Sequence, residues 1–176
     1  MKFHETKLKG AFIIEPELFQ DDRGFFARTW CQRESEAVGL RADWLQCNVS
    51  FNRVKGTLRG MHYQASPWKE IKLVRCSRGA IYDVIIDLRR QSATYKHWIG
   101  VELTAENYRM VYVPKGFAHG FLTLRDESEV FYQMSQFYSP EHARGVRWDD
   151  PAFGIKWPIG VSVITERDRS YADFTD

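Results

Sequence analysis

We expect residues 1–176 to form one all-β domain, a double-stranded β-helix (jelly roll) with short peripheral helices. The chain has 176 residues, of which 44% are hydrophobic; this is enough for one core, and the length argues against two domains. Aromatic residues are abundant at 15%, and they favour strands. Apolar runs of strand length recur about every 8–12 residues with turn signals between them, a spacing typical of sandwiches and barrels.

The N-terminal quarter is expected to be less regular than the rest. Residues 6–15 look like one strand or two, and residues 25–30 like another. Between them, residues 19–24 combine two aspartates with a glycine, which is the composition of a turn. Residues 32–40 are the best helix candidate, a short helix that closes at Gly39.

From residue 44 onward the pattern is almost entirely that of strands. The clearest turns are Arg78-Gly79 and residues 105–107. Because no crossover helices separate consecutive runs, neighbouring strands should pair antiparallel. The predicted strands are 44–52, 56–64, 71–77, 80–88, 98–104, 109–113, 120–124 and 129–138, with a last strand-like run at 161–164.

Charge and cysteine content exclude several classes of protein. The 25 basic and 23 acidic residues nearly balance, whereas a nucleic-acid binder usually shows a basic excess. No run of about 18 apolar residues is present, so we expect no membrane span. The three cysteines, Cys31, Cys47 and Cys76, form no CxxC motif, and the polar N-terminus has no secretory signal. A cytoplasmic location is therefore expected.

Two segments each place a histidine beside glycine and a cation: residues 58–64 and 114–121. A histidine in a strand is most often structural, but Gly60 lies two residues before His62, and a glycine there would leave room for a ligand. Imidazole titrates near neutral pH, so His62 and His119 are suited to proton transfer. The nearby cations Arg59, Lys72 and Lys115 suggest a pocket for an anionic substrate.

A metal site is not expected. Residues 114–119 (Pro-x-Gly-x-x-His) match half of the cupin metal signature, but the other half needs a His-x-His pair, and residues 62–64 are His-Tyr-Gln. The remaining histidines, His4, His97 and His142, have no ligand-like spacing, and a transition metal usually takes three protein ligands. A metal-dependent cupin oxygenase or isomerase stays as an alternative.

Several other polar residues could serve the same pocket. The arginine fork suits phosphate oxygens, which makes Arg23, Arg59 and Arg75 candidates together with Lys72, although each alone is most often a solvated surface charge. Tyr132 is usually a core aromatic in such a run, but a phenol that faces a pocket can act as a general acid. Asp168 follows the last strand-like run and would by itself be a surface carboxylate.

Eight segments, in this order, make the chain resemble the dTDP-4-dehydrorhamnose 3,5-epimerase family over nearly its whole length. They are Asp22-Arg-Gly-Phe-Phe26, Gln46-x-Asn48-x-Ser50, Leu58-Arg-Gly-Met-His-Tyr-Gln64, Lys72-Leu-Val-Arg75, Asp83-Val-Ile-Ile-Asp-Leu-Arg89, Val113-Pro-x-Gly-Phe-Ala-His-Gly-Phe121, Gly145-Val-Arg-Trp-Asp-Asp-Pro151 and Ile155-x-Trp-Pro158. The resemblance implies a homodimeric jelly roll without metal or cofactor. It also implies an isomerase that inverts carbon 3, carbon 5 or both of a nucleotide-diphospho-4-keto-6-deoxy sugar.

The resemblance also implies roles for individual residues. His62 corresponds to the base, Tyr132 to the acid on the opposite face of the sugar, Asp168 to the carboxylate that orients the histidine, and Lys72 to the cation near the ketone oxygen. The substrate-binding positions are Arg23, Phe26, Arg28, Gln46, Asn48, Arg59, His119 and Arg167.

Three of the family's positions differ in this chain. Arg28 and Ala143 stand where the family usually has Glu in its nucleotide-binding set, and Arg167 where Lys is common. Because the charge at position 28 is reversed, the sequence does not identify which nucleotide and which sugar the substrate contains. A ketoisomerase and a non-catalytic nucleotide-sugar-binding module are the other functional alternatives. For the homodimer, a strand at 6–15 could add to a partner's sheet.

Overall fold

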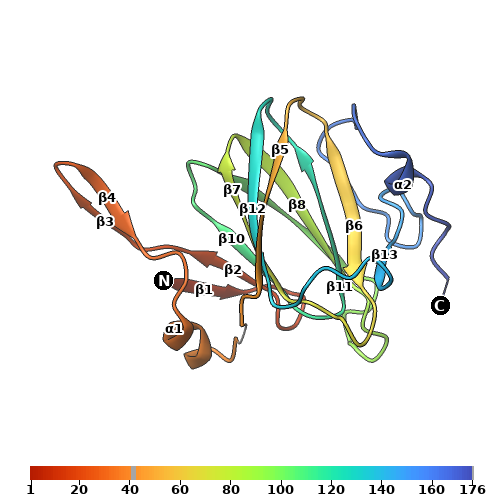
Figure 1. Cartoon of the computed structure of the whole chain (residues 1–176), viewed down its shortest axis with the longest axis horizontal. Coiled ribbons are helices and arrows are strands. Elements are labelled where there is room, and N and C mark those ends of the chain that lie inside the picture. Colours follow the sequence, from red (N-terminus) through yellow and green to blue (C-terminus); the bar gives the residue numbers. More distant parts are fainter. Residues whose placement is uncertain (41–42, 176) are drawn as a thin grey trace.

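The computed structural model describes residues 1–40 and 43–175 and consists mainly of two antiparallel sheets packed face to face (Figure 1). The six-stranded sheet has the order β1 (Lys2–Glu5), β2 (Phe12–Glu15), β10 (Met110–Val113), β7 (Lys72–Arg78), β12 (Ser128–Met134), β5 (Gln46–Asn52). The five-stranded sheet has the order β13 (Ala143–Gly145), β6 (Leu58–Gln64), β11 (Phe117–Thr123), β8 (Ala80–Asp87), β9 (Trp98–Thr104). The predicted all-β class is confirmed.

All eight strands predicted between residues 44 and 138 are present, and they pair antiparallel as expected. Strand β11 begins at Phe117 rather than at residue 120, because Phe117 and Ala118 already pair with β8. Strand β12 ends at Met134, four residues before the predicted end. The strand-like run 161–164 is not a strand: it forms one isolated parallel bridge, Thr57 to Val163.

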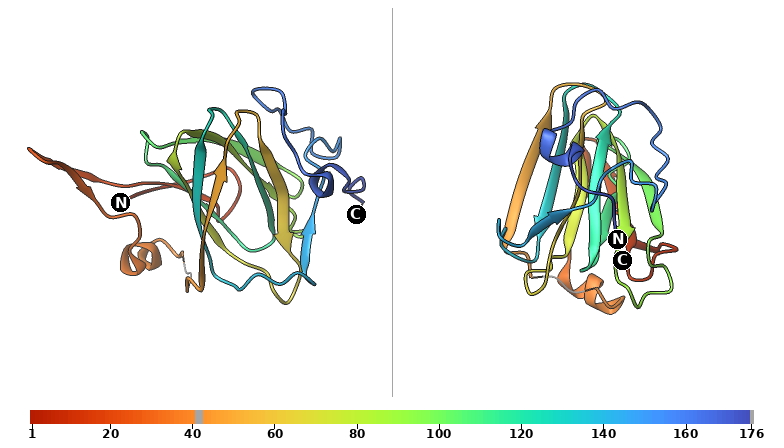
Figure 2. Two further views of the ribbon diagram at one scale, coloured as in Figure 1. Left: turned by 45° about the horizontal axis from the view of Figure 1, so that its top comes forward. Right: turned by 90° about the vertical axis from the view of Figure 1, so that its right-hand side faces the viewer.

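The turn predicted at residues 19–24 is shorter in the structure. The segment is a hairpin of β3 (Leu18–Asp21) and β4 (Gly24–Ala27), and only two residues form the turn. The Asp21 carboxylate accepts the backbone N–H of Arg23 at 2.9 Å, which closes the turn locally. Figures 1 and 2 show this hairpin extending away from the two sheets. The strand predicted at 25–30 accordingly ends at Ala27.

Three other N- and C-terminal features differ from expectation. Of the strand predicted at 6–15, only Phe12–Glu15 forms a strand, because residues 7–10 form a turn. Strands β1 and β13 were not predicted, because neither has an alternation of apolar and polar residues that could be detected. The helix expected at 32–40 is α1 (Gln32–Ala37), followed by Gly39 at a φ of +80°. A second short helix, α2 (Glu166–Arg169), is capped at its N-terminus by Thr165, whose hydroxyl accepts the Asp168 N–H.

The core lies mainly between the two sheets. Val74 and Val130 from the six-stranded sheet meet Ile81, Ile85 and Phe121 from the five-stranded sheet, all nearly without solvent exposure. Part of the outer face of each sheet is also covered. A cluster with Leu40 packs on the six-stranded sheet, and one with Phe153 from the C-terminal segment packs on the five-stranded sheet. Burial on both faces holds the strands rigidly, so the side chains between the sheets are well placed for a site.

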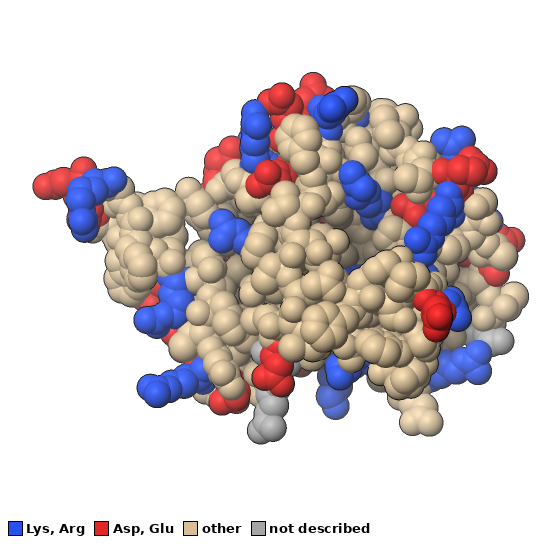
Figure 3. Space-filling view, in the orientation of Figure 1, with Lys and Arg blue, Asp and Glu red and all other residues tan. Residues whose placement is uncertain are grey.

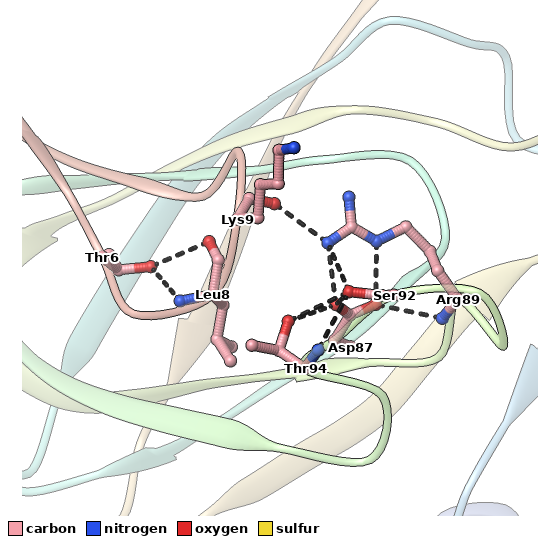
Figure 4. A network of polar contacts seen from close by, with 7 residues as sticks. All are labelled: Thr6, Leu8, Lys9, Asp87, Arg89, Ser92 and Thr94. Carbon is pink, nitrogen blue, oxygen red and sulfur yellow. Dashed lines mark hydrogen bonds and ion pairs between the residues drawn. The ribbon is translucent and has the colours of Figure 1, made fainter.

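A buried polar network lies at the end of β8 and in the loop that follows it (Figure 4). Asp87, at the end of β8, is fully buried, and its carboxylate accepts hydrogen bonds from Arg89 Nε at 2.8 Å, Ser92 Oγ at 2.6 Å and Thr94 Oγ1 at 2.7 Å. Arg89 also donates to the Lys9 carbonyl at 2.9 Å. Burial would raise the pKa of Asp87, but these hydrogen bonds outweigh it and lower the pKa to about 2.

The network predicts a loss of stability in acid. Because the pKa of Asp87 is lower in the folded chain than the usual 3.8, its carboxylate stabilises the fold above pH 4, and this contribution disappears as the pH falls through about 2. The pKa difference corresponds to about 2 kcal/mol at pH 7. Urea unfolding should therefore show Asp87→Asn less stable than wild type at pH 7, with a gap that shrinks to under half by pH 2. A gap independent of pH would contradict the assignment.

Charge on the surface is mixed. On the face shown in Figure 3, Lys and Arg side chains alternate with Asp and Glu and form no continuous basic stripe. Within the described part of the chain, no helix has the length and apolar content needed to cross a membrane.

Candidate active site

A cavity of about 540 Å³ opens between the two sheets. Both sheets contribute side chains to it, and so does the segment that leads into α2. The lining residues are Val49, Ser50 and Phe51 of β5, Arg59 and His62 of β6, Lys72 of β7, His119 and Phe121 of β11, Tyr132 of β12, and Thr165, Arg167 and Asp168. All four predicted catalytic residues therefore reach one cavity.

His62 and Asp168 form a hydrogen-bonded pair on one side of this cavity. The His62 Nε2 lies 2.7 Å from Asp168 Oδ1, and the other carboxylate oxygen accepts the Gly60 backbone N–H at 3.1 Å. Burial would raise the pKa of Asp168, but the hydrogen bonds from His62 and Gly60 lower it below its usual value. Since a carboxylate only accepts, neutral His62 carries its proton on Nε2, which leaves Nδ1 as the basic nitrogen.

Tyr132 enters the same cavity from the facing sheet. Its side chain is half-buried, and burial raises the pKa of the phenol above its usual value, with Arg59 opposing the shift. The phenol therefore keeps its proton at neutral pH. The two sheets thus present an imidazole and a protonated phenol to one space.

Lys72 is buried in the cavity and is paired with a residue that sequence analysis missed. Its Nζ lies 3.0 Å from Oε1 of Glu70, which is itself buried. The two residues stand two positions apart, which in extended chain places them on one side. The two-residue spacing is compatible with an ion pair, but the sequence Glu-Ile-Lys is too common to predict one.

His119 pairs with another carboxylate that was not predicted. Its Nε2 lies 2.7 Å from Asp83 Oδ2, and both residues are buried. Strands β6 and β11 run side by side with His62 opposite His119. A Cβ on Gly60, which has a φ of +142°, would lie 2.6 Å from the Gly120 Cα. The glycine thus allows close approach of β11, not the room for a ligand that we expected.

Of the predicted substrate-binding residues, Arg59 and Arg167 also line the cavity, whereas Gln46 and Asn48 do not. Arg59 donates to Asn52 Oδ1 at 2.7 Å, and Arg167 donates to the Tyr171 hydroxyl at 3.1 Å. Gln46 and Asn48 are on β5 but are not among the lining residues: Asn48 is the register partner of Tyr132, and Gln46 accepts the Tyr138 N–H at 2.8 Å.

The three remaining binding candidates lie outside the cavity of their own chain. Arg23 and Phe26 are on the projecting hairpin, where the Arg23 side chain is 89% exposed and Phe26 is 68% exposed. Arg28 lies just after β4 and pairs with Glu34 at 2.8 Å; the same carboxylate accepts the N-terminal ammonium of Met1. Within one chain, the structure does not bring these three to the site.

A smaller cavity of about 210 Å³ continues the site. It shares His62, Lys72, Tyr132 and Arg167 with the larger cavity. Its other lining residues are Tyr63, Gln64, Glu70, Met134, Tyr138, Ala143 and Arg144. The proposed catalytic side chains therefore stand at the junction of the two spaces. Among residues 1–40 and 43–175, no cluster of three or more His, Cys, Asp or Glu side chains is arranged to hold a metal ion.

Comparison with known proteins gives matches along the whole chain. Residues 5–176 match the family model described as dTDP-4-dehydrorhamnose 3,5-epimerase. The dTDP-4-dehydrorhamnose 3,5-epimerase of Methanothermobacter thermautotrophicus is 45% identical over 173 residues, covering 97% of this chain and 92% of that protein. The enzyme of the same name from Escherichia coli is 40% identical over 165 residues, covering 93% and 89%.

Solved structures agree with these relatives. The dTDP-4-dehydrorhamnose 3,5-epimerase of Bacillus anthracis, crystallised with TDP and PPi, superposes with a TM-score of 0.95 at 42% identity, covering 98% of this chain and 99% of that one. The Legionella pneumophila epimerase in complex with dTDP-4-keto-L-rhamnose gives a TM-score of 0.88 at 37% identity, covering 95% and 89%. The predicted jelly-roll fold is confirmed.

Proposed function

The chain belongs to the dTDP-4-dehydrorhamnose 3,5-epimerase family, and we propose from this premise that it is an isomerase that inverts carbon 3, carbon 5 or both of a nucleotide-diphospho-4-keto-6-deoxy sugar. The observation that carries the proposal is the cavity in which His62, held by Asp168, and Tyr132 come from facing sheets. Inversion needs a base on one face of the carbon and an acid on the other, and this placement supplies one of each.

In the first step, His62 removes the proton alpha to the ketone. The C–H electron pair becomes a C=C bond, the carbonyl π pair moves onto oxygen, and the proton goes to the free imidazole nitrogen. The product is an enolate and an imidazolium. Asp168 stabilises the imidazolium, as the buried carboxylate does in a Ser-His-Asp triad.

In the second step, Tyr132 donates its proton to the opposite face of the same carbon. The C=C pair takes this proton, the ketone re-forms, and the centre is inverted. Tyr132 is left as phenolate and His62 as imidazolium until solvent restores both. Burial suits Tyr132 to this step because it keeps the phenol protonated until a strong base, the enolate carbon, is present.

Cations of the cavity stabilise the charges of the substrate. The Lys72 ammonium is placed to stabilise the enolate oxygen, and preorganised electrostatic help of this kind is often the largest catalytic contribution. Arg59 and Arg167 are suited to the diphosphate, since guanidinium groups bind phosphate oxygens through paired hydrogen bonds. Thymidine diphosphate is the nucleotide we propose, because the Bacillus anthracis structure was solved with TDP.

Solvent exchange tests this function. In D₂O, the protein should place deuterium on carbon 3, carbon 5 or both of a dTDP-4-keto-6-deoxy sugar, and NMR of the product should show the inverted configuration. Uridine, cytidine and guanosine versions of the substrate establish which base is accepted. Transfer of the keto group along the ring would instead favour the ketoisomerase, and tight binding with no exchange would favour a non-catalytic module.

A homodimer is part of the proposal. The projecting hairpin exposes Phe19, Phe25 and Phe26 together, an apolar surface that a monomer rarely leaves uncovered. A hairpin donated to a second copy would bury this surface and could bring Arg23 to the partner subunit's cavity. Sedimentation at micromolar concentration should give twice the chain mass of 20.7 kDa, and Arg23→Ala should weaken substrate binding. A monomer with full affinity in the variant would refute this arrangement.

We also propose a cytoplasmic location. Cys31, Cys47 and Cys76 are all free thiols in the structure, and free thiols persist in a reducing compartment.

A further inference from the structure

Glu70 is a buried carboxylate of the site to which the preceding mechanism gives no role. Its side chain is 5% exposed, and its Oε1 lies 3.0 Å from the Nζ of Lys72, whose side chain is 11% exposed. The other oxygen, Oε2, accepts the backbone N–H of Gln64 at 3.2 Å. Both carboxylate oxygens are therefore engaged, which fixes the group in one orientation.

Gln64, whose backbone N–H holds Glu70, is itself fixed by hydrogen bonds. The Gln64 side chain donates from Nε2 to the carbonyls of Trp68, at 3.0 Å, and Phe137, at 3.2 Å, and its Oε1 accepts the Ser139 N–H at 2.6 Å. These hydrogen bonds join the loop after β6 to the loop after β12. Glu70 thus stands on a rigid base that includes the loops on two sides of the smaller cavity.

Lys72 depends on this carboxylate. An ammonium group has three donors, and within the described residues Glu70 is its one ion-pair partner. Removing a charge from water is unfavourable unless an opposite charge and hydrogen bonds compensate. Glu70 supplies that compensation from the side of the smaller cavity, which leaves the remaining N–H donors of Lys72 for the space that it shares with His62 and Tyr132.

We propose that Glu70 is a positioning residue for the reaction: it holds the Lys72 ammonium aimed at the ketone oxygen that becomes negative when the alpha proton leaves. Glu70 itself exchanges no proton with the substrate and acts only through Lys72. This inference rests on the proposed function, because it assumes that an enolate forms beside Lys72. Placement of such a group matters, since a shift of about 1 Å can cost roughly 10²-fold in rate.

A double-mutant cycle tests the proposal with four proteins: wild type, Glu70→Gln, Lys72→Met and the double variant. Glu70→Gln keeps the shape of the side chain and should lower kcat by about 10- to 100-fold. KM should change little, because the diphosphate contacts lie elsewhere. In the Lys72→Met background the same change should alter kcat by less than about threefold, because Glu70 then has nothing to position. Glu129→Gln is the matched control: Glu129 accepts a hydrogen bond from Ser77 at 2.8 Å, away from the cavity.

Each outcome decides the matter. Wild-type kcat in Glu70→Gln, or an equal loss with and without Lys72, would overturn the proposal. If Glu70→Gln alone does not fold, the double variant, which removes both charges, is compared with Lys72→Met: equal rates support the proposal and a further loss refutes it. A wild-type protein that exchanges no deuterium would refute the epimerase function instead, so the two failures are distinguishable.

Discussion

Replacing His62 by alanine should slow both solvent exchange and inversion, with a loss of about 10²–10⁴-fold in kcat. The reason is access: His62 and His119 are the two histidines that line the cavity in the described part of the chain, and each is held by a carboxylate, but the His62 side chain is 40% exposed whereas the His119 side chain is 9% exposed. A substrate in the cavity therefore reaches His62 more readily. NMR in D₂O measures exchange at each alpha carbon and inversion in one experiment.

The matched control is His97→Ala, since His97 is exposed on the loop before β9 and lies outside both cavities of the site. It should exchange deuterium at the wild-type rate. Exchange that survives in His62→Ala at more than about a tenth of the wild-type rate would assign the base elsewhere.

Replacing Tyr132 by phenylalanine should separate the two halves of the reaction. The variant retains His62, so the alpha proton still leaves and deuterium still enters, but the deuteron returns from the face that lost the proton. We therefore expect inversion to fall by about 10²–10⁴-fold while exchange stays within about tenfold of wild type. The measurement is the ratio of retained, deuterated sugar to inverted sugar.

Tyr82→Phe is the control for this variant, because the pKa of that phenol is also raised by burial but Tyr82 packs on Trp157 outside the site. It should leave the ratio unchanged. Equal losses of exchange and inversion in Tyr132→Phe would mean that the phenol supports substrate binding and is not the acid. The pair of variants thus assigns each face of the sugar to one side chain.

Sequence analysis predicted the fold from local signals. Runs such as 98–104 and 80–88 carry β-branched and aromatic residues between turn residues, and they became β9 and β8 with boundaries within one residue. The failures were segments without that signal. Strand β1 is polar and exposed, and the β3–β4 hairpin was taken for a turn because its aspartates and glycine dominate six residues.

The site was predicted in part. His62, Lys72, Tyr132 and Asp168 received their predicted roles from the family resemblance and lie at one cavity, while Glu70 and Asp83, which pair with Lys72 and His119, were missed. Glu70 lies in none of the eight segments that carry the resemblance, and Asp83 is 36 positions from His119, on a different strand. Arg23, Phe26 and Arg28 were predicted as binding residues, yet none lines the cavity of its own chain, because the hairpin points away from the sheets.

Composition, alternation and motif order were enough to establish the all-β class and the family, because both are recorded in residues close together along the chain. Contacts between side chains that are far apart along the chain are not recorded in such local patterns. His62 and Asp168 are 106 positions apart, and Tyr132 comes from the opposite sheet. Their meeting depends on the register of every strand between them, and register is settled by the burial of all the strands at once. The candidate active-site cavity is for that reason a product of the folded chain as a whole.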